Sequence, residues 1–296
     1  MISFVLLSSA LATEPAFCPN DVLSGVPATE AHRDGPGRLW VEVDGHGDGL
    51  RFYGAMAGDA GAAPVIFLEG DVLRQVSGSL ASGVEWQVVD GYAQLSPALL
   101  QGEAAQYAAA TARSFVNLAR PGAYGSSGHH RQRRREREVA LVDRALDRLK
   151  KRFGWSRIDL AGVSGGGHLV AALMGRRSDI DRAVIASGNV AVRKRAQERG
   201  LETGVTGYAD FVDPIDLVQQ VARHPPRKLI MLTDPRDMLV SASSQAAYLE
   251  ALRGSGVEVE QRLVPARDPN HHLLRVPAIM AALAGAPDSR FPLDPW

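Results

Sequence analysis

Residues 158–174 read IDLAGVSGGGHLVAALM. The first six form a run of strand length that is apolar except for Asp159, and the residues after the glycines form a run of helical length. Between them, Gly162-Val163-Ser164-Gly165-Gly166 fits G-x-S-x-G, in which a serine sits on a sharp turn from a strand into a helix. The same glycines could form a phosphate loop, but the Gly-Lys-Ser/Thr ending of such a loop is missing. The stretch therefore predicts a nucleophile at Ser164.

The remainder of the chain alternates strands and helices around this stretch. The predicted strands are 39–43, 50–57, 64–68, 114–118, 158–163, 183–186, 228–233 and 257–264, and the predicted helices are 133–153, 166–175, 243–253 and one from about 273. Continuous apolar strands that alternate with helices indicate an α/β fold with a mostly parallel sheet covered on both faces. Residues 72–112 show no clear pattern, so we expect an irregular excursion there. No linker or repeat divides the sequence, which predicts a single domain over 39–284 with a lid insertion at 188–227.

A serine hydroxyl needs a base, and the base needs an acid that orients it. The apolar strand 228–233 ends in Asp234-Pro235-Arg236-Asp237, and open α/β sheets place their sites at the carboxyl ends of strands. The strand 257–264 is followed by a loop with His271 and His272. The order serine, acid, histidine is the one found on sheets of this type. From these residues alone, either aspartate and either histidine qualifies.

These motifs together resemble those of a known family. The chain resembles the α/β-hydrolase superfamily, and most closely its prolyl-oligopeptidase-like and dienelactone-hydrolase-like serine hydrolases, over roughly Pro64 to Ala284. The segments that carry the resemblance are 162–168 (GVSGGGH), 234–240 (DPRDMLV), 271–273 (HHL) and the loop 120–128 (RPGAYGSSG). The resemblance implies an α/β-hydrolase fold and hydrolysis through an acyl-serine intermediate, with no cofactor.

The resemblance also implies which residues act. The acid is expected at Asp237 rather than Asp234, because the family places its acid at this Asp-x-x-Val position. The base is expected at His271 rather than His272, because the family shows a histidine, a variable residue and then the apolar start of the last helix.

An oxyanion hole is implied as well. Its donors would be the amide of Gly165 and an amide just after the third strand of the family's fold, which here is Asp71 or else Val72. Many relatives carry His-Gly where this chain has Glu69-Gly70-Asp71. That departure leaves the identity of the second donor open.

Three functions are compatible with these residues. The first is hydrolysis of a small-molecule ester, with Ser164 as nucleophile, His271 as base and Asp237 as the orienting acid. The second is a serine peptidase of the prolyl-oligopeptidase-like type that takes short peptides. The third, a binding protein on the hydrolase fold without catalysis, is disfavoured by an intact serine, aspartate and histidine in the expected order. The sequence does not name the acyl group, the leaving group or the oligomeric state.

Composition excludes other classes of protein. The 296 residues carry 33 Lys plus Arg and 33 Asp plus Glu, so the net charge is zero, which argues against nucleic acid as a partner. An apolar share of 45% is that of a globular protein. The basic segment 129–137 has no interleaved aromatic residues, so we expect a solvated helix start rather than a nucleic-acid patch.

The N-terminus resembles an export signal. Residues 2–12 are mostly apolar and end in Ala10-Leu11-Ala12, which has the form of a signal-peptidase site, although no basic residue precedes them. We therefore expect a signal peptide over residues 1–12 and export, periplasmic or secreted, with a buried N-terminal segment in a cytoplasmic protein as the alternative. No other run approaches the 18 apolar residues of a membrane span, and the single cysteine, Cys18, has no partner for an internal disulfide.

Overall fold

The structure is a computed structural model that describes residues 5–6, 14–57, 63–79, 83–200, 210–224 and 228–283. The chain divides into two compact units. The first comprises residues 1–66 and 71–156, and the second comprises 67–70 and 157–296. The division falls within and just after strand β4 (Val65–Leu68). The expected single domain over 39–284 stays a prediction.

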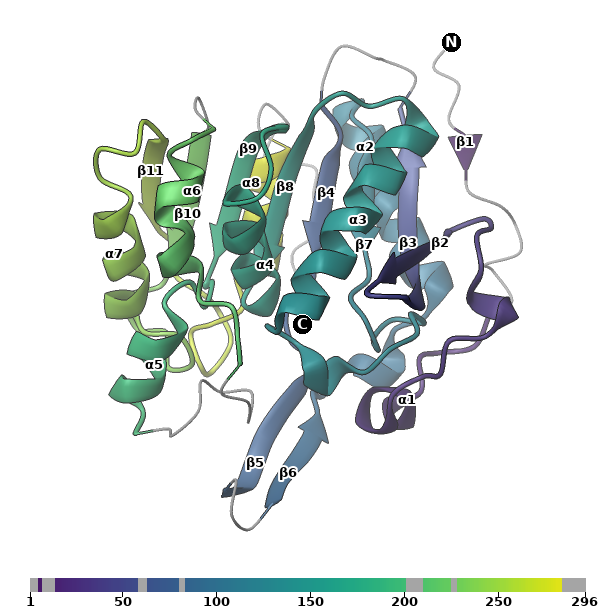
Figure 1. The fold of residues 1–296 in the computed structure, drawn as a ribbon, viewed down its shortest axis with the longest axis horizontal. Coiled ribbons are helices and arrows are strands. Elements are labelled where there is room, and N and C mark those ends of the chain that lie inside the picture. The colour runs from purple at the N-terminus through teal and green to yellow at the C-terminus, as the bar shows by residue number, and fades with distance from the viewer. Residues whose placement is uncertain are drawn as a thin grey trace. The chain divides into compact units, whose positions relative to one another are not determined.

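The first unit is built around a long central strand. Strand β3 (His46–Met56) pairs antiparallel with β1 (Val5–Leu6), β2 (Arg38–Val43) and β7 (Phe115–Leu118). Strands β5 (Leu73–Ser79) and β6 (Gly83–Val88) form a separate antiparallel ribbon (Figure 1). The helices are α1 (Pro19–Ser24), α2 (Pro97–Thr111) and α3 (Glu136–Phe153), with short 3-10 turns η2 (Glu30–His32), η3 (Tyr92–Gln94) and η4 (His130–Gln132).

Helix α2 corrects the expectation of an irregular excursion over 72–112, since that range holds a ribbon and a helix of 15 residues. The side chain of Ser96 accepts the amide of Leu99 at 3.2 Å, and Pro97 begins the helix, which are standard signals for a helix start. The helix packs against β3 and β7. Its many alanines give no apolar stripe, so the helical period is hidden in the sequence.

The expected signal peptide, residues 1–12, lies outside the described residues except for β1. There Val5 and Leu6 pair with Met56 and Ala55 at the end of β3. Export therefore stays a prediction. Among the described helices, none has the length and apolar character needed to cross a membrane.

The second unit confirms the predicted parallel sheet. Strands β8 (Ile158–Val163), β9 (Ile180–Ala186), β10 (Lys228–Thr233) and β11 (Glu258–Leu263) lie side by side and parallel in this order. Helices α4 (Gly165–Met174) and α8 (Arg275–Ala282) pack on opposite faces of β8 and β9 (Figure 1). The other helices are α5 (Val192–Glu198), α6 (Val218–Val221) and α7 (Ala242–Ala251). Strand β8 is buried along its whole length, as its mostly apolar sequence predicts, and Asp159 is buried with it.

The expected lid, 188–227, is described only in part. It contains α5, the 3-10 turn η5 (Pro214–Leu217) and α6, while 201–209 and 225–227 lie outside the described residues. The carboxylate of Asp213 accepts the amides of Val192 and Arg193 at 2.8 and 3.0 Å, which fixes the start of α5. Whether the segment acts as a lid stays a prediction.

Candidate active site

Ser164 occupies the turn from β8 into α4. Its backbone has φ 53° and ψ −113°, a conformation that residues other than glycine rarely adopt. Holding a serine in this conformation costs about 1–3 kcal/mol of folding free energy. Its amide donates to the carbonyl of Ala186 at 2.8 Å, and its carbonyl accepts the amide of His168 at 3.1 Å. The structure therefore places Ser164 on a strained strand-to-helix turn, as the motif predicts.

The glycines of the motif are needed for close packing. A Cβ at Gly162 would lie 2.5 Å from the backbone of Gly166, and a Cβ at Gly166 would lie 2.0 Å from the carbonyl oxygen of Leu68. Both distances are impossible for a real side chain. Gly70 also lies against the serine, because a Cβ there would be 3.4 Å from the Cβ of Ser164. Leu68 at the end of β4, and Gly70 after it, thus lie close to the turn that holds Ser164.

Asp237 lies in the loop after β10 with its carboxylate fully buried. One carboxylate oxygen accepts the amides of Leu239 and Val240, each at 2.8 Å. The other oxygen lies 2.8 Å from Nδ1 of His272. A carboxylate held by two amides and bonded to one imidazole nitrogen is the arrangement of an orienting acid.

The expected pair of Asp237 with His271 is wrong, because Asp237 contacts His272 instead. His272 is 5% exposed, whereas the side chain of His271 is 32% exposed and its Nδ1 lies 3.5 Å from the Asp234 carboxylate with no hydrogen-bond partner. The two imidazoles do point in different directions, as expected for adjacent loop residues. The sequence pattern therefore predicted the wrong histidine as the partner of Asp237.

The turn that contains the histidines explains this difference. One carboxylate oxygen of Asp268 accepts the amides of His272 and Leu273 at 2.8 and 2.7 Å, and the other accepts the amide of Asn270 at 3.0 Å. His271 has a left-handed backbone, φ 53°, within this turn. Sequence reasoning missed the role of Asp268, although Asp268-Pro269-Asn270 is a recognisable turn signal.

Within the described residues, no hydrogen bond joins the hydroxyl of Ser164 to either imidazole. Catalytic hydrogen bonds are often long or poorly aligned before a substrate binds. The acid and histidine are therefore paired in the structure, whereas the serine's link to the histidine is a proposal.

The carboxylate of Asp234 is held by backbone amides and an arginine. Its buried carboxylate accepts the amide of Ala266 at 2.8 Å and the amide of Arg236 at 2.9 Å, and the Arg236 guanidinium lies 3.2 Å away. Burial opposes ionisation, but these hydrogen bonds outweigh it and lower the pKa of Asp234 to about 2. This carboxylate ties the end of β10 to the segment that follows β11.

An ion pair holds the residue before Gly70. The guanidinium of Arg275, at the start of α8, donates to both carboxylate oxygens of Glu69 at 2.8 to 3.1 Å. Glu69 is 6% exposed, so the pair is nearly dry. A two-pronged contact of this kind restricts orientation as well as distance. Sequence reasoning could not detect this pair, because Glu69 and Arg275 lie 206 residues apart.

Asp71, the expected second oxyanion donor, belongs to the first unit, where its carboxylate contacts three arginines. Its oxygens lie 2.8, 3.3 and 2.5 Å from the guanidinium groups of Arg120, Arg133 and Arg134. Burial opposes ionisation, but Arg134, Arg120 and Arg133 hold the pKa of the Asp71 carboxyl well below its usual range. All three arginines are buried. The expectation that segment 129–137 is solvated is therefore wrong for Arg133 and Arg134.

The alternative donor, Val72, has its amide occupied. That amide donates to Nε2 of His130 at 3.2 Å, and Nδ1 of the same ring lies 3.3 Å from the carbonyl of Pro121. The ring must accept at one nitrogen and donate at the other, so it is neutral. Burial and the charge of Arg120 hold the pKa of His130 well below its usual range. The amide of Val72 is therefore not free to act as an oxyanion donor, and a donor at Asp71 stays a prediction.

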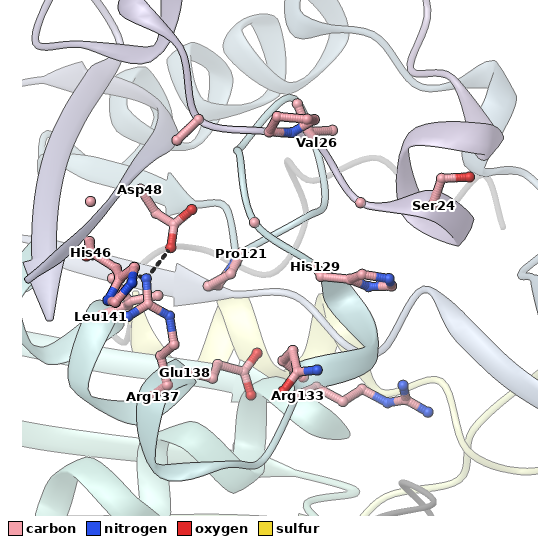
Figure 2. Close-up of a pocket in the computed structure, with 16 residues that line it drawn as sticks. Ser24, Val26, His46, Asp48, Pro121, His129, Arg133, Arg137, Glu138 and Leu141 are labelled. Atoms are coloured by element: carbon pink, nitrogen blue, oxygen red, sulfur yellow. Dashed lines mark hydrogen bonds and ion pairs between the residues drawn. The ribbon is translucent and has the colours of Figure 1, made fainter. Parts of the chain in front are cut away.

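A cavity of about 530 Å³ lies in the first unit (Figure 2). Its lining includes Asp48, whose carboxylate lies 2.6 Å from the guanidinium of Arg137. Arg137 also donates to the carbonyl of Val43 at 2.9 Å. Neither Ser164 nor His272 lines this cavity. Its charged side chains hold the β2–β3 turn to α3, and we assign no reaction to it.

Solved structures resemble the chain, although no family model and no curated protein matches its sequence. Est1E from Butyrivibrio proteoclasticus, solved with ferulic acid, is 13% identical, with a TM-score of 0.56 over 83% of this chain and 96% of that one. The esterase Pf2001 of Pyrococcus furiosus is 13% identical, with a TM-score of 0.52 over 85% and 88%. The acylaminoacyl peptidase of Pyrococcus horikoshii is 12% identical, with a TM-score of 0.53 over 83% of this chain and 39% of that one. At such identities the likeness concerns the fold.

Proposed function

Because the chain has the α/β-hydrolase fold, we propose that it is a serine hydrolase that cleaves small-molecule esters, with Ser164 as nucleophile, His272 as base and Asp237 as orienting acid. The observation that carries this proposal is the buried 2.8 Å contact of Asp237 with His272 in the same unit as the strained turn at Ser164. Buried, paired groups of this kind are costly to maintain and typical of active sites.

The acylation step follows from the hydrogen bonds. The Asp237 carboxylate accepts the proton on Nδ1 of His272, which leaves Nε2 as the free base. Nε2 takes the proton of the Ser164 hydroxyl as its oxygen attacks the ester carbonyl carbon. The imidazolium then returns that proton to the departing alkoxide, the alcohol leaves, and the acyl group stays on the serine. Water repeats the sequence to release the acid and restore Ser164.

The tetrahedral intermediate carries a negative oxygen that needs donors. We propose the amide of Gly165, the first residue of α4, and the amide of Asp71, which directly follows Gly70. The close approach of Gly70 to Ser164 supports a donor at this point of the chain. In comparable sites each donor is worth about 3–4 kcal/mol of transition-state stabilisation.

Peptide hydrolysis is the second candidate. The likeness to an acylaminoacyl peptidase favours it, but this chain spans 39% of that protein's length. Both reactions use the same acyl-serine chemistry, so they differ in which leaving group is accepted.

Labelling with a fluorophosphonate tests the proposed nucleophile. The probe forms a covalent bond to an activated serine, so we expect the wild-type protein and the control Ser178→Ala, an exposed serine of the same unit, to label. Ser164→Ala should remain folded and unlabelled. A wild-type chain that never labels would favour a binding protein, and a Ser164→Ala variant that labels would move the nucleophile elsewhere.

A substrate panel then separates the two reactions. We expect turnover of p-nitrophenyl esters and slower or no turnover of aminoacyl p-nitroanilides. Faster hydrolysis of the anilides would make the protein a peptidase with the same triad.

We also propose export through cleavage after residue 12. The support is the apolar segment 2–12 with its Ala10-Leu11-Ala12 ending. The intact mass of the native protein measures the cleavage directly. A mature chain that begins at Met1 would favour the cytoplasmic alternative.

A further inference from the structure

Strand β11 has an exposed free edge in the second unit. Among the described strands it pairs with β10 alone, and five of its six residues are exposed, with Glu260 of intermediate exposure. The exposed residues include two with apolar side chains, since Val259 is 38% and Leu263 is 67% exposed. A free edge presents unpaired backbone donors and acceptors to any strand that fits beside it.

The backbone of β11 determines which residues present those groups. The amide of Val264 donates to the carbonyl of Thr233 at 2.9 Å, so even-numbered residues direct their backbone groups toward β10. Because successive residues alternate, the odd-numbered residues Val259, Gln261 and Leu263 direct theirs toward the free edge.

This alternation restricts how a second copy of β11 could pair antiparallel with the first. Odd-numbered residues must oppose odd-numbered ones, which leaves pairings centred on Glu260, Gln261 or Arg262. Centring on Glu260 or on Arg262 sets that residue opposite its own copy, so two like charges meet. Centring on Gln261 sets Glu260 opposite the partner's Arg262, and does so twice because of the two-fold symmetry.

The same central register matches the other face of the strand. It sets Val259 opposite the partner's Leu263, again twice, so the exposed apolar side chains cover one another. Within one copy, Glu260 already contacts Arg262 at 2.7 Å and Lys228 at 3.4 Å. Pairing would extend this row of alternating charges across the interface. The sequence Glu258-Val259-Glu260-Gln261-Arg262-Leu263 is thus complementary to itself in one register.

We propose that the protein forms a two-fold dimer in which the free edge of β11 pairs antiparallel with the same edge of a second copy, centred on Gln261. The pairing would add about six backbone hydrogen bonds across three opposed residue pairs. One strand edge buries less surface than a standard stable interface of about 1,600 Å². The dimer should therefore be weak and should dissociate on dilution.

Sedimentation velocity over a wide range of protein concentration tests the proposal. We expect the wild-type chain to shift from monomer to dimer as concentration rises. Arg262→Glu and Glu260→Arg each turn two attractive pairs into repulsive ones and should weaken association about tenfold or more. Arg253→Glu, which changes the same charge on an exposed residue outside β11, should associate like the wild type.

Mixing the two variants gives the sharpest test. In a mixed dimer every Glu–Arg contact is restored, since one copy supplies arginine at both 260 and 262 and the other supplies glutamate at both. The mixture should therefore associate when neither variant does alone. Gln261→Pro should also abolish the dimer, because it removes an amide that faces the free edge and none that bonds β10.

Three results would overturn the proposal. The first is a wild-type chain that stays monomeric at every concentration, which would mean that another occupant or none covers the edge. The second is a dimer that neither single charge variant weakens. The third is a mixture that associates no better than its components.

Discussion

Exchanging each histidine of the 271–272 pair for asparagine separates their roles in one experiment. His272→Asn removes the one imidazole that, among the described residues, bonds the buried Asp237, and with it the proposed base for Ser164. Loss of the histidine from a serine triad costs about 10⁴–10⁶ in kcat, or about 5–8 kcal/mol of transition-state stabilisation. His271→Asn removes a partly exposed ring whose Nδ1 lies 3.5 Å from the Asp234 carboxylate without a hydrogen bond. Asparagine also tolerates the left-handed backbone at 271, so we expect a change below about threefold.

The assay is kcat and KM for a p-nitrophenyl ester, with the melting temperature of each variant as the control for folding. We expect His272→Asn to melt normally and to be inactive, and exogenous imidazole to restore part of the activity of His272→Gly. An inactive His271→Asn beside an active His272→Asn would refute the reasoning from the Asp237 contact. It would return the role to the residue that the sequence favoured.

Three further outcomes follow from the site. Asp237→Asn should lower kcat about 10⁴-fold. Asp234→Asn should cost about 1–3 kcal/mol of stability in chemical denaturation and leave the folded enzyme active. The reverse ranking of activities would assign the role of orienting acid to Asp234. Arg275→Met should destabilise the fold, because it leaves Glu69 buried and unpaired. The double variant Arg275→Met with Glu69→Leu should recover the stability but not kcat. Full recovery of kcat in the double variant would show that the ion pair does not position the site. His130 has a lowered pKa when folded, so the unfolded chain binds more protons below its ordinary pKa of about 6.5, and stability falls as the pH falls. Between pH 7.5 and 5.5 this one group should cost about 1.4 kcal/mol, and His130→Gln should flatten that part of the profile in urea unfolding; an unchanged slope would contradict the neutral ring.

The sequence predicted well whatever depended on local pattern. Strands β8 and β10 begin and end where their apolar runs do, at 158–163 and 228–233. The turn at Ser164 was predictable because a strand, a small-residue turn and a helix follow one another directly. Helix α2 was missed because it is rich in alanine and buries residues without a helical stripe.

Features that depend on contacts distant in sequence were not predictable. The contact of Asp237 with His272 rather than His271 depends on the turn that Asp268 organises and on a positive φ at His271. The burial of Arg133 and Arg134 depends on Asp71, about sixty residues earlier. Charge runs in a sequence are usually solvated, and here a single distant carboxylate reverses that expectation.

The strained backbone at Ser164 has an evolutionary consequence. Glycine adopts φ 53° with ψ −113° freely, so replacing the serine by glycine would relieve strain of about 1 kcal/mol or more while removing the proposed nucleophile. Stability and activity therefore pull this position in opposite directions. Selection for hydrolysis must continually hold the serine in place, and a lineage released from that selection would drift toward glycine and become a more durable, inactive copy of the same fold.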